Sequence, residues 1–180
     1  MAVVTATGIN NFKGSVSTTF SIVNAVFSFN SGYETDYFMR ANEYVAEDHT
    51  YYSKNRTIVV AGISAGTTIQ DFINNEFDAD MRDNVLVYTS ADRIINDKST
   101  VLGTGMKLVL LDDGKIIDIV SVAVTGDLDG DGYVTTSDVV LFSKQLQKPG
   151  SITYAQFRAA DMSGDGKVTI DDYLQFIKLL

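Results

Sequence analysis

Hydrophobic and polar residues alternate with a period of two in residues 2–23, a pattern typical of β-strands. Val16 and Phe20 lie on one side of the second alternating run, and Gly14 marks a turn between the two runs. A lone two-stranded hairpin is only marginally stable in water, so it needs a surface to pack on. We therefore expect residues 1–24 to be a packed hairpin or the last strands of a preceding domain.

Short strands and one helix are predicted in residues 25–124. Apolar positions recur at helical spacing between Thr68 and Phe77, and Thr68 is a good helix cap. The dipeptide Asp113-Gly114 is the one preferred in two-residue hairpin turns. Strands are expected at residues 57–63, at residues 84–88 and on both sides of the turn within residues 107–124. Because strands outnumber helices, this stretch is predicted to be a small β-rich module.

Residues 125–180 lack strand alternation and contain an internal repeat. The twelve residues that begin at Asp127 match the twelve that begin at Asp161, an offset of 34 residues. Each copy continues into a helical pattern, and Thr153 with Gln156 forms a capping-box pair for a third helix. Helices are expected at residues 137–146, 154–160 and 171–180. The predicted fold class is therefore α+β with several modules, a β-rich part preceding an all-α part.

The repeated segment has the spacing of a calcium-binding loop. Calcium takes about six to eight oxygen ligands, and a twelve-residue loop supplies them from positions 1, 3, 5, 7, 9 and 12, with glycine at position 6. Gly132 and Gly166 occupy position 6 of the two copies. Two Ca²⁺ ions are predicted, and the residue at position 7 would bind through its backbone carbonyl. The predicted ligands are Asp127, Asp129, Asp131, Tyr133, Thr135 and Asp138 in the first loop, and Asp161, Ser163, Asp165, Lys167, Thr169 and Asp172 in the second.

Charge repulsion supports this interpretation over that of an acidic surface turn. Two loops in register carry oxygen-bearing residues at every side-chain ligand position, and the seven carboxylates at these positions converge on two points. Like charges at such distances repel each other, and two calcium ions would remove the repulsion. A stretch of about 55 residues without a disulfide also needs further stabilisation. We expect residues 125–180 to fold on binding calcium and to loosen without it.

Two features differ from an ordinary EF-hand, whose loop lies between two helices. The strand-like run at residues 116–124 leads almost directly into the first loop, so the entering helix is missing there. Position 12 is Asp in both copies, Asp138 and Asp172, and its carboxylate reaches less far than that of Glu. Val134 and Val168, at position 8, are expected to pair the two loops and to enter the core.

A duplicated loop of this form, each copy followed by a helix, resembles the dockerin domain over residues 125–180. Dockerins bind cohesin modules and assemble bacterial polysaccharide-degrading complexes such as cellulosomes and amylosomes. The resemblance implies a non-catalytic, calcium-dependent module that docks a secreted protein onto the cohesin of a scaffoldin, and that is a monomer when unbound. Family contacts at loop positions 10 and 11 and beyond correspond to Thr136, Ser137, Ser143, Lys144, Lys148, Ile170, Asp171, Ile177 and Lys178.

The contact positions of the two repeats do not match each other. Many dockerins have matching pairs at these positions and bind in two orientations. Here Thr136 corresponds to Ile170, and Ser143 to Ile177, so a single orientation is expected. Among the nearby apolar residues Val140, Phe142 and Ile177, the sequence leaves open which belong to the core and which to the interface.

Two further resemblances concern the residues before the repeat. Residues 25–124 resemble the X module that often precedes such dockerins, through the helix start at residues 65–68, the Gly-Thr-Gly at residues 103–105 and the strand that runs into Gly126. Residues 2–23 resemble the last strands of a bacterial Ig-like repeat. These likenesses imply the C-terminal part of a longer secreted protein, extracellular or attached to the cell surface through a scaffoldin, with a catalytic or sugar-binding part upstream.

Composition excludes several other classes of function. The net charge of −9 argues against nucleic acid or an anionic membrane as a partner. No apolar run approaches the about 20 residues of a membrane-spanning helix, and the first residues lack the basic region of a signal peptide. Cysteine is absent, which excludes disulfides, zinc-thiolate sites and thiol catalysis.

Other candidate sites have simpler explanations. Asp112 and Asp113 lie at a hairpin tip rather than across a cleft, and His49 has no cysteine and no candidate triad beside it. Residues 103–105 are predicted to be a hairpin or bulge rather than a nucleotide loop, because no helix follows them. No hydrolase is therefore expected, and the remaining alternative is a calcium-stabilised structural module without a cohesin partner. A cluster of aromatic residues is expected in the core rather than on a sugar-binding surface: Phe27, Phe29, Tyr33, Tyr37, Phe38, Tyr44, Tyr51 and Tyr52.

Overall fold

The computed structural model of the chain describes residues 2–7, 15–20, 29, 35–39 and 56–180. Strands β1 (Ala2–Thr7) and β2 (Ser15–Phe20) pair in antiparallel register, with Ala2 opposite Phe20. This confirms the predicted pairing within residues 2–23. The predicted turn between the strands lies outside the described residues.

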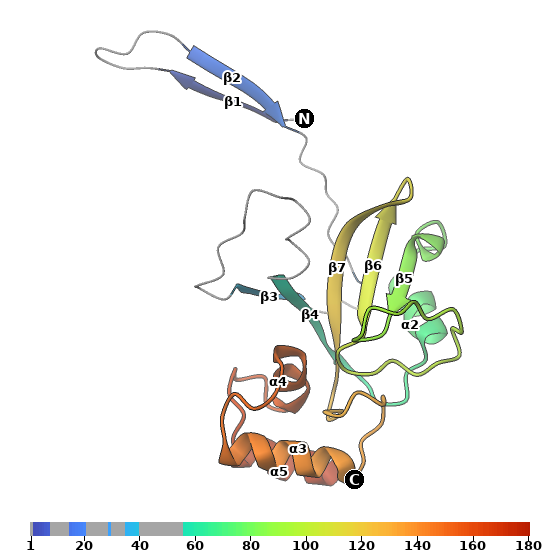
Figure 1. The fold of residues 1–180 in the computed structure, drawn as a ribbon, viewed down its shortest axis with the longest axis vertical. Coiled ribbons are helices and arrows are strands. Elements are labelled where there is room, and N and C mark those ends of the chain that lie inside the picture. The colour runs from blue at the N-terminus through green and yellow to red at the C-terminus, as the bar shows by residue number, and fades with distance from the viewer. Residues whose placement is uncertain (1, 8–14, 21–28, 30–34, 40–55) are drawn as a thin grey trace.

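A five-stranded sheet is the centre of the described structure (Figure 1). Its order is β3-β4-β7-β6-β5, and all neighbours are antiparallel except β4 and β7, which are parallel. Asp113 and Gly114 have φ values of 47° and 72°, as a two-residue turn between β6 and β7 requires. The strands are β3 (Thr35–Met39), β4 (Arg56–Ile63), β5 (Val85–Tyr88), β6 (Lys107–Asp112) and β7 (Lys115–Val124).

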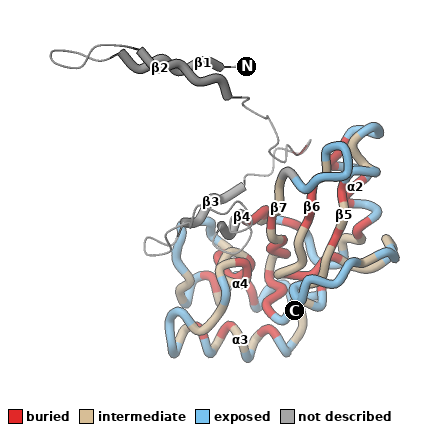
Figure 2. The backbone as a smooth tube through the Cα atoms, turned by 45° about the horizontal axis from the view of Figure 1, so that its top comes forward, coloured by how far each residue is buried: buried red, intermediate tan, exposed pale blue. Residues whose placement is uncertain are grey.

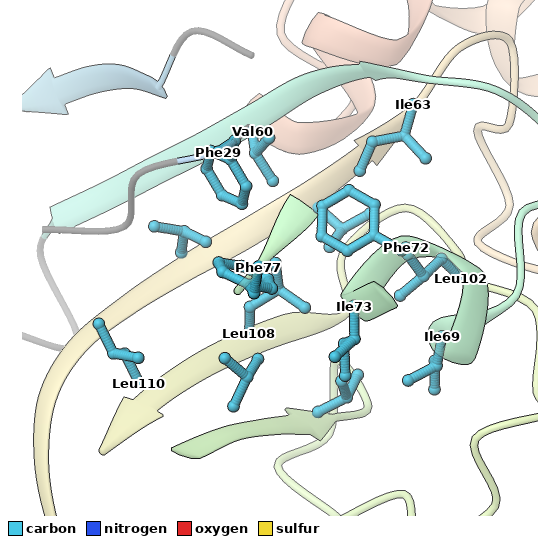
Figure 3. Close-up of a cluster of buried hydrophobic side chains, with 14 of the residues drawn as sticks. Phe29, Val60, Ile63, Ile69, Phe72, Ile73, Phe77, Leu102, Leu108 and Leu110 are labelled. Carbon is cyan, nitrogen blue, oxygen red and sulfur yellow. The ribbon is translucent and has the colours of Figure 1, made fainter. Parts of the chain in front are cut away.

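Helix α2 (Ile69–Glu76) packs on one face of this sheet and forms the larger core with it (Figure 3). Thr68 caps the helix as predicted, because its hydroxyl oxygen accepts the Asp71 N–H at 3.1 Å. The Phe29 ring contacts Phe72 and Phe77, with ring centroids 5.9 and 5.5 Å apart. Phe29 is thus in the core as expected, whereas the side chains of the other seven aromatic residues of the predicted cluster, and His49, lie outside the described part.

The C-terminal part consists of helices that follow the predicted positions closely. They are α3 (Thr136–Gln147), α4 (Tyr154–Ala160), α5 (Ile170–Phe176) and the 3-10 helix η3 (Ile177–Leu179); a further 3-10 helix, η2 (Arg82–Asn84), precedes β5. The last α-helix is shorter than expected, because its final turn tightens to 3-10 geometry where the chain ends. Leu128, Phe142, Ala160 and Phe176 form a second core between these helices.

Helix α4 packs on the opposite face of the sheet from α2, against β4 and β7 (Figure 2). Alternation along the strands explains this: Val60 and Val122 belong to the α2 core, whereas Val59 and Ala123 contact α4. Both faces are therefore buried where the two helices cover the strands, which is why the adjacent pairs Val59-Val60 and Val122-Ala123 are apolar. The described fold is α+β, and none of its helices has the length and apolarity to span a membrane.

Candidate calcium-binding sites

The first repeat loop connects the sheet to helix α3. Strand β7 ends at Val124, and the loop starts three residues later at Asp127, so no helix enters it, as the sequence predicts. The second loop differs in this respect. It begins at Asp161, directly after α4, and leads into α5, so a helix lies on each side of it.

Three carboxylates converge in the first loop. Ligand oxygens of Asp127, Asp129 and Asp131 all lie within 4.8 Å of one another. Asp127 is fully buried, and its two oxygens accept the N–H groups of Gly130 at 2.7 Å and Gly132 at 3.1 Å. A cluster of hard, negatively charged oxygens at this spacing fits calcium, which needs oxygen ligands and offsets their mutual repulsion.

The second loop repeats these internal hydrogen bonds. Asp161 Oδ1 accepts the Gly164 N–H at 2.9 Å, and its Oδ2 accepts the Gly166 N–H at 2.9 Å. Asp165 Oδ1 accepts the Lys167 N–H at 2.9 Å, as Asp131 Oδ1 accepts that of Tyr133 at 2.8 Å. The two loops thus have a common backbone arrangement, although Ser163 stands where the first loop has a third carboxylate.

The last predicted ligands of each loop also start the following helix. Thr135 and Thr169 are the N-caps of α3 and α5, and their own N–H groups each donate to the buried carboxylates of Asp138 and Asp172 at 2.8 Å. Both pairs are capping boxes. The Thr-x-x-Asp spacing could have predicted them from the sequence, as Thr153 and Gln156 did for α4. That these four residues also ligate calcium stays a prediction.

The valines at position 8 do not pair the loops by a backbone bridge. Val134 and Val168 have no β-bridge in the described structure, which corrects one part of the expectation. Both side chains pack against the core formed by Phe142 and Phe176, which confirms the other part. The hydrophobic core between the helices therefore joins the two repeats.

The predicted partner contacts lie on the outer surface of α3, α5 and η3. All nine are exposed except Ser143, which is half-buried. The structure also separates the three apolar candidates: Phe142 is buried, whereas Val140 and Ile177 are 67% and 39% exposed. The sequence interpretation did not include some exposed apolar residues of this region, among them Leu174. Leu174 is 56% exposed and lies 34 residues after Val140, so the repeat itself could have revealed it.

Burial and neighbouring charges change the acidity of the first loop. Burial raises the pKa of Asp127 above its ordinary value of 3.8, although hydrogen bonds from Thr104, Gly130 and Gly132 oppose the change. Burial also raises the pKa of Asp129, helped by the charges of Asp138 and Asp131. In the calcium-free protein, a raised pKa contributes stability below the unfolded value that is lost as pH rises through the folded value. The ionised loop is therefore unfavourable at neutral pH until a cation binds.

We expect the stabilisation by calcium to grow with pH in a window that begins above 3.8, because protons would compete with calcium for the predicted ligands Asp127 and Asp129. Burial alone would raise the pKa of Asp172, but hydrogen bonds from Thr169 and Ser163 outweigh it and lower that pKa. The stability that ionised Asp172 contributes is therefore lost only at pH values below this window. The check is the difference in melting temperature between calcium-loaded and calcium-free protein, measured from about pH 4 to about pH 7. A constant difference over this range would contradict the expectation.

Comparison with known proteins identifies the C-terminal part. The family model of the dockerin type I domain matches residues 125–180. No curated protein and no solved structure matches the chain. Dockerin domains are non-catalytic modules that bind calcium and cohesins. Residues 125–180, with their two repeat loops and helices α3 to α5, are a dockerin type I domain.

Proposed function

We propose that residues 125–180 bind two calcium ions and, in that state, dock the protein that carries them onto a cohesin module of a scaffoldin. Asp127, Asp129 and Asp131 would hold the first ion together with the remaining positions of their loop. Asp161, Ser163 and Asp165 would take the same part in the second. The ions supply charge neutralisation, so that the loops keep the geometry from which α3 and α5 begin.

The observation that carries this proposal is the outer surface of the two repeat helices. Val140 on α3 is 67% exposed, and Ile170 and Leu174 on α5 are 58% and 56% exposed. These three side chains are not what packs the two helices together. The inner faces of the helices meet through Phe142 and Phe176, whose ring centroids are 5.2 Å apart. Exposed apolar side chains beside polar residues on a helix surface are typical of a protein-binding site.

The residues near Val140 and Leu174 differ between the two repeats and favour one binding orientation. Val140 and Leu174 occupy equivalent positions of the two repeats, so both orientations would present an apolar centre. The rim differs, because exposed Thr136 corresponds to exposed Ile170, and half-buried Ser143 corresponds to exposed Ile177. A partner whose contacts suit one rim leaves groups unpaired against the other.

The wider setting follows from the family. Proteins that carry dockerins are typically extracellular, and cohesins belong to scaffoldins of polysaccharide-degrading complexes. We place this protein in such a complex, a cellulosome or an amylosome, as a monomer before it binds.

The direct test is a calorimetric titration of the full chain against a panel of cohesin modules, with calcium and with a chelator. We expect calcium-dependent binding to at least one cohesin. Replacing both Val140 and Leu174 by Ala should weaken it by about 100-fold or more, because central apolar contacts carry most of the binding energy. Ile116→Ala is the matched control, since Ile116 is 60% exposed on β7, outside the dockerin domain. Binding that survives the chelator would contradict the proposal.

The same titration distinguishes the structural alternative, in which calcium only stabilises the C-terminal part. In that case no cohesin binds, and Lys144→Ala and Ile177→Ala change no binding, while melting still depends on calcium. Lys144 and Ile177 are both exposed, so their substitution tests the surface without disturbing the core.

A further inference from the structure

The first calcium loop is in contact with a segment of the β-rich part, residues 101–104, which precedes β6. The Thr104 N–H donates a hydrogen bond to Asp127 Oδ2 at 2.8 Å, and both residues are buried. A second bond comes from the turn before α2, where the Gly66 N–H donates to the Gly132 carbonyl at 2.8 Å. Two separate pieces of chain that precede the dockerin domain are therefore bonded to its first loop.

The contact is so close that only glycines permit it. A Cβ atom on Gly103 would lie 2.0 Å from the Gly130 carbonyl oxygen, and one on Gly132 would lie 2.5 Å from the Leu102 carbonyl oxygen. Both obstacles are backbone atoms, which cannot turn aside as a flexible side chain can. Gly130 and Gly132 occupy positions 4 and 6 of the calcium loop, so the 101–104 segment lies directly against the turn that forms the site.

Within the described part of the chain, the second loop has no such cover. A Cβ atom on Gly164 or on Gly166 would meet no described residue within 4 Å. Asp161 Oδ2, the atom equivalent to the one bonded by Thr104, accepts instead from the guanidinium of Arg158 at 3.1 Å. The first aspartates of the two loops, Asp127 and Asp161, therefore have different partners. A neutral backbone N–H orients Asp127, whereas a positive charge lies beside Asp161.

This difference has a direct consequence for metal binding. A hydrogen bond from a rigid donor holds a ligand in its binding orientation, and loss of such a partner typically weakens metal affinity by about 10- to 100-fold. At the second loop, the positive charge of Arg158 repels an incoming cation instead of helping it. Among the described residues, the first site thus has a hydrogen-bond donor outside the dockerin domain, and the second does not.

We propose that the 101–104 segment of the β-rich part belongs to the outer shell of the first calcium site, so that the affinity of this site alone depends on the preceding module. The proposal rests on the calcium binding proposed above. It gives the β-rich part a specific role: it positions Asp127 through Thr104 and shapes the loop through Gly103.

The test uses calcium titration calorimetry of the full chain with Gly103→Ala. Gly103→Ala is combined in turn with two variants of the exposed carboxylates at position 5, so that each site is measured separately. Asp165→Ala weakens the second site and leaves the first to be measured, and Asp131→Ala does the reverse. We expect Gly103→Ala to weaken the first site by about 10- to 100-fold and the second by less than about 3-fold. Gly114→Ala is the control, because it strains a turn with φ of 72° in the same module, but its Cβ atom would meet no described residue within 4 Å. It should leave both affinities unchanged.

A second measurement needs no change in the contact and covers the case in which Gly103→Ala does not fold. In the NMR spectrum of the otherwise unmodified chain, the Thr104 amide signal should shift as calcium fills the first site. The shift should persist with Asp165→Ala and be lost with Asp131→Ala. This inference alone would be overturned if Gly103→Ala weakened both sites equally or weakened neither. It would also be overturned if the Thr104 amide signal did not change as calcium fills the first site. Absence of any calcium binding to the unmodified chain would instead overturn the proposed function.

Discussion

Removal of calcium is expected to lower the stability of residues 125–180 by several kcal/mol, which is the largest effect that we predict. With a dissociation constant of about 1 μM, within the range of calcium-sensing loops, about 1 mM calcium stabilises the folded protein by about 4 kcal/mol per site. The gain is local, because the carboxylates that repel each other lie in the two loops. The measurement is thermal unfolding of the full chain, followed by circular dichroism, in calcium and in a chelator.

The control for this experiment separates the loops from the general negative charge. Asp112→Ala removes an exposed carboxylate at the hairpin tip between β6 and β7, outside both loops, and should leave the response to calcium intact. Asp131→Ala should remove a large part of it. We expect the core around Phe72 to stay folded without calcium, because it contains no loop residue. An unchanged melting curve on chelation would refute the calcium sites.

Replacing Phe142 by Ala is expected to cost about 3 to 5 kcal/mol of unfolding free energy, the usual cost of deleting a fully buried aromatic ring. Phe142 has no exposed surface, and its ring centroid lies 5.2 Å from that of Phe176 and 5.4 Å from that of Tyr173. These contacts join α3 of the first repeat to α5 of the second. The measurement is denaturant-induced unfolding in calcium, and we expect the variant to lose cohesin binding together with its fold.

Val140→Ala is the matched control, two residues away on the same helix. Because Val140 is 67% exposed, its truncation should change the unfolding free energy by less than about 0.5 kcal/mol. It should nevertheless weaken cohesin binding, so the two variants separate a core residue from a surface residue. If Val140→Ala destabilised the protein as much as Phe142→Ala, the assignment of the two faces of α3 would be wrong.

Turns and helix starts could be predicted from the sequence wherever the residues that form them lie within a few positions of each other. The Asp113-Gly114 turn and the capping box of Thr153 and Gln156 are correct because the atoms that form them belong to adjacent residues. The order of the sheet could not be predicted in this way. Strands β4 and β7 pair in parallel across about 60 residues, as Val59 opposite Ser121 shows. No local pattern specifies such a partner, since many apolar strands would fit the same position.

The candidate site also has a part that the sequence predicts and a part that only the structure shows. A calcium loop places its ligands within twelve consecutive residues, so their spacing is visible in the sequence and so is their repetition. Whether Val140 or Phe142 faces the core is not visible, since both are apolar. Successive helix residues are about 100° apart, so these two point in nearly opposite directions, and only the position of Phe176 decides which is inside.

The sequence by itself determined the two loops, the helices that follow them and the dockerin family, because ligand spacing and helix starts are short-range properties. Only the tertiary structure decided that Thr104 donates to Asp127, that Arg158 takes the equivalent place at Asp161, and that α4 covers the sheet. These contacts join residues that are distant in the chain or that differ between otherwise matching repeats. Their formation depends on how whole elements pack, and packing leaves no signature within any one segment.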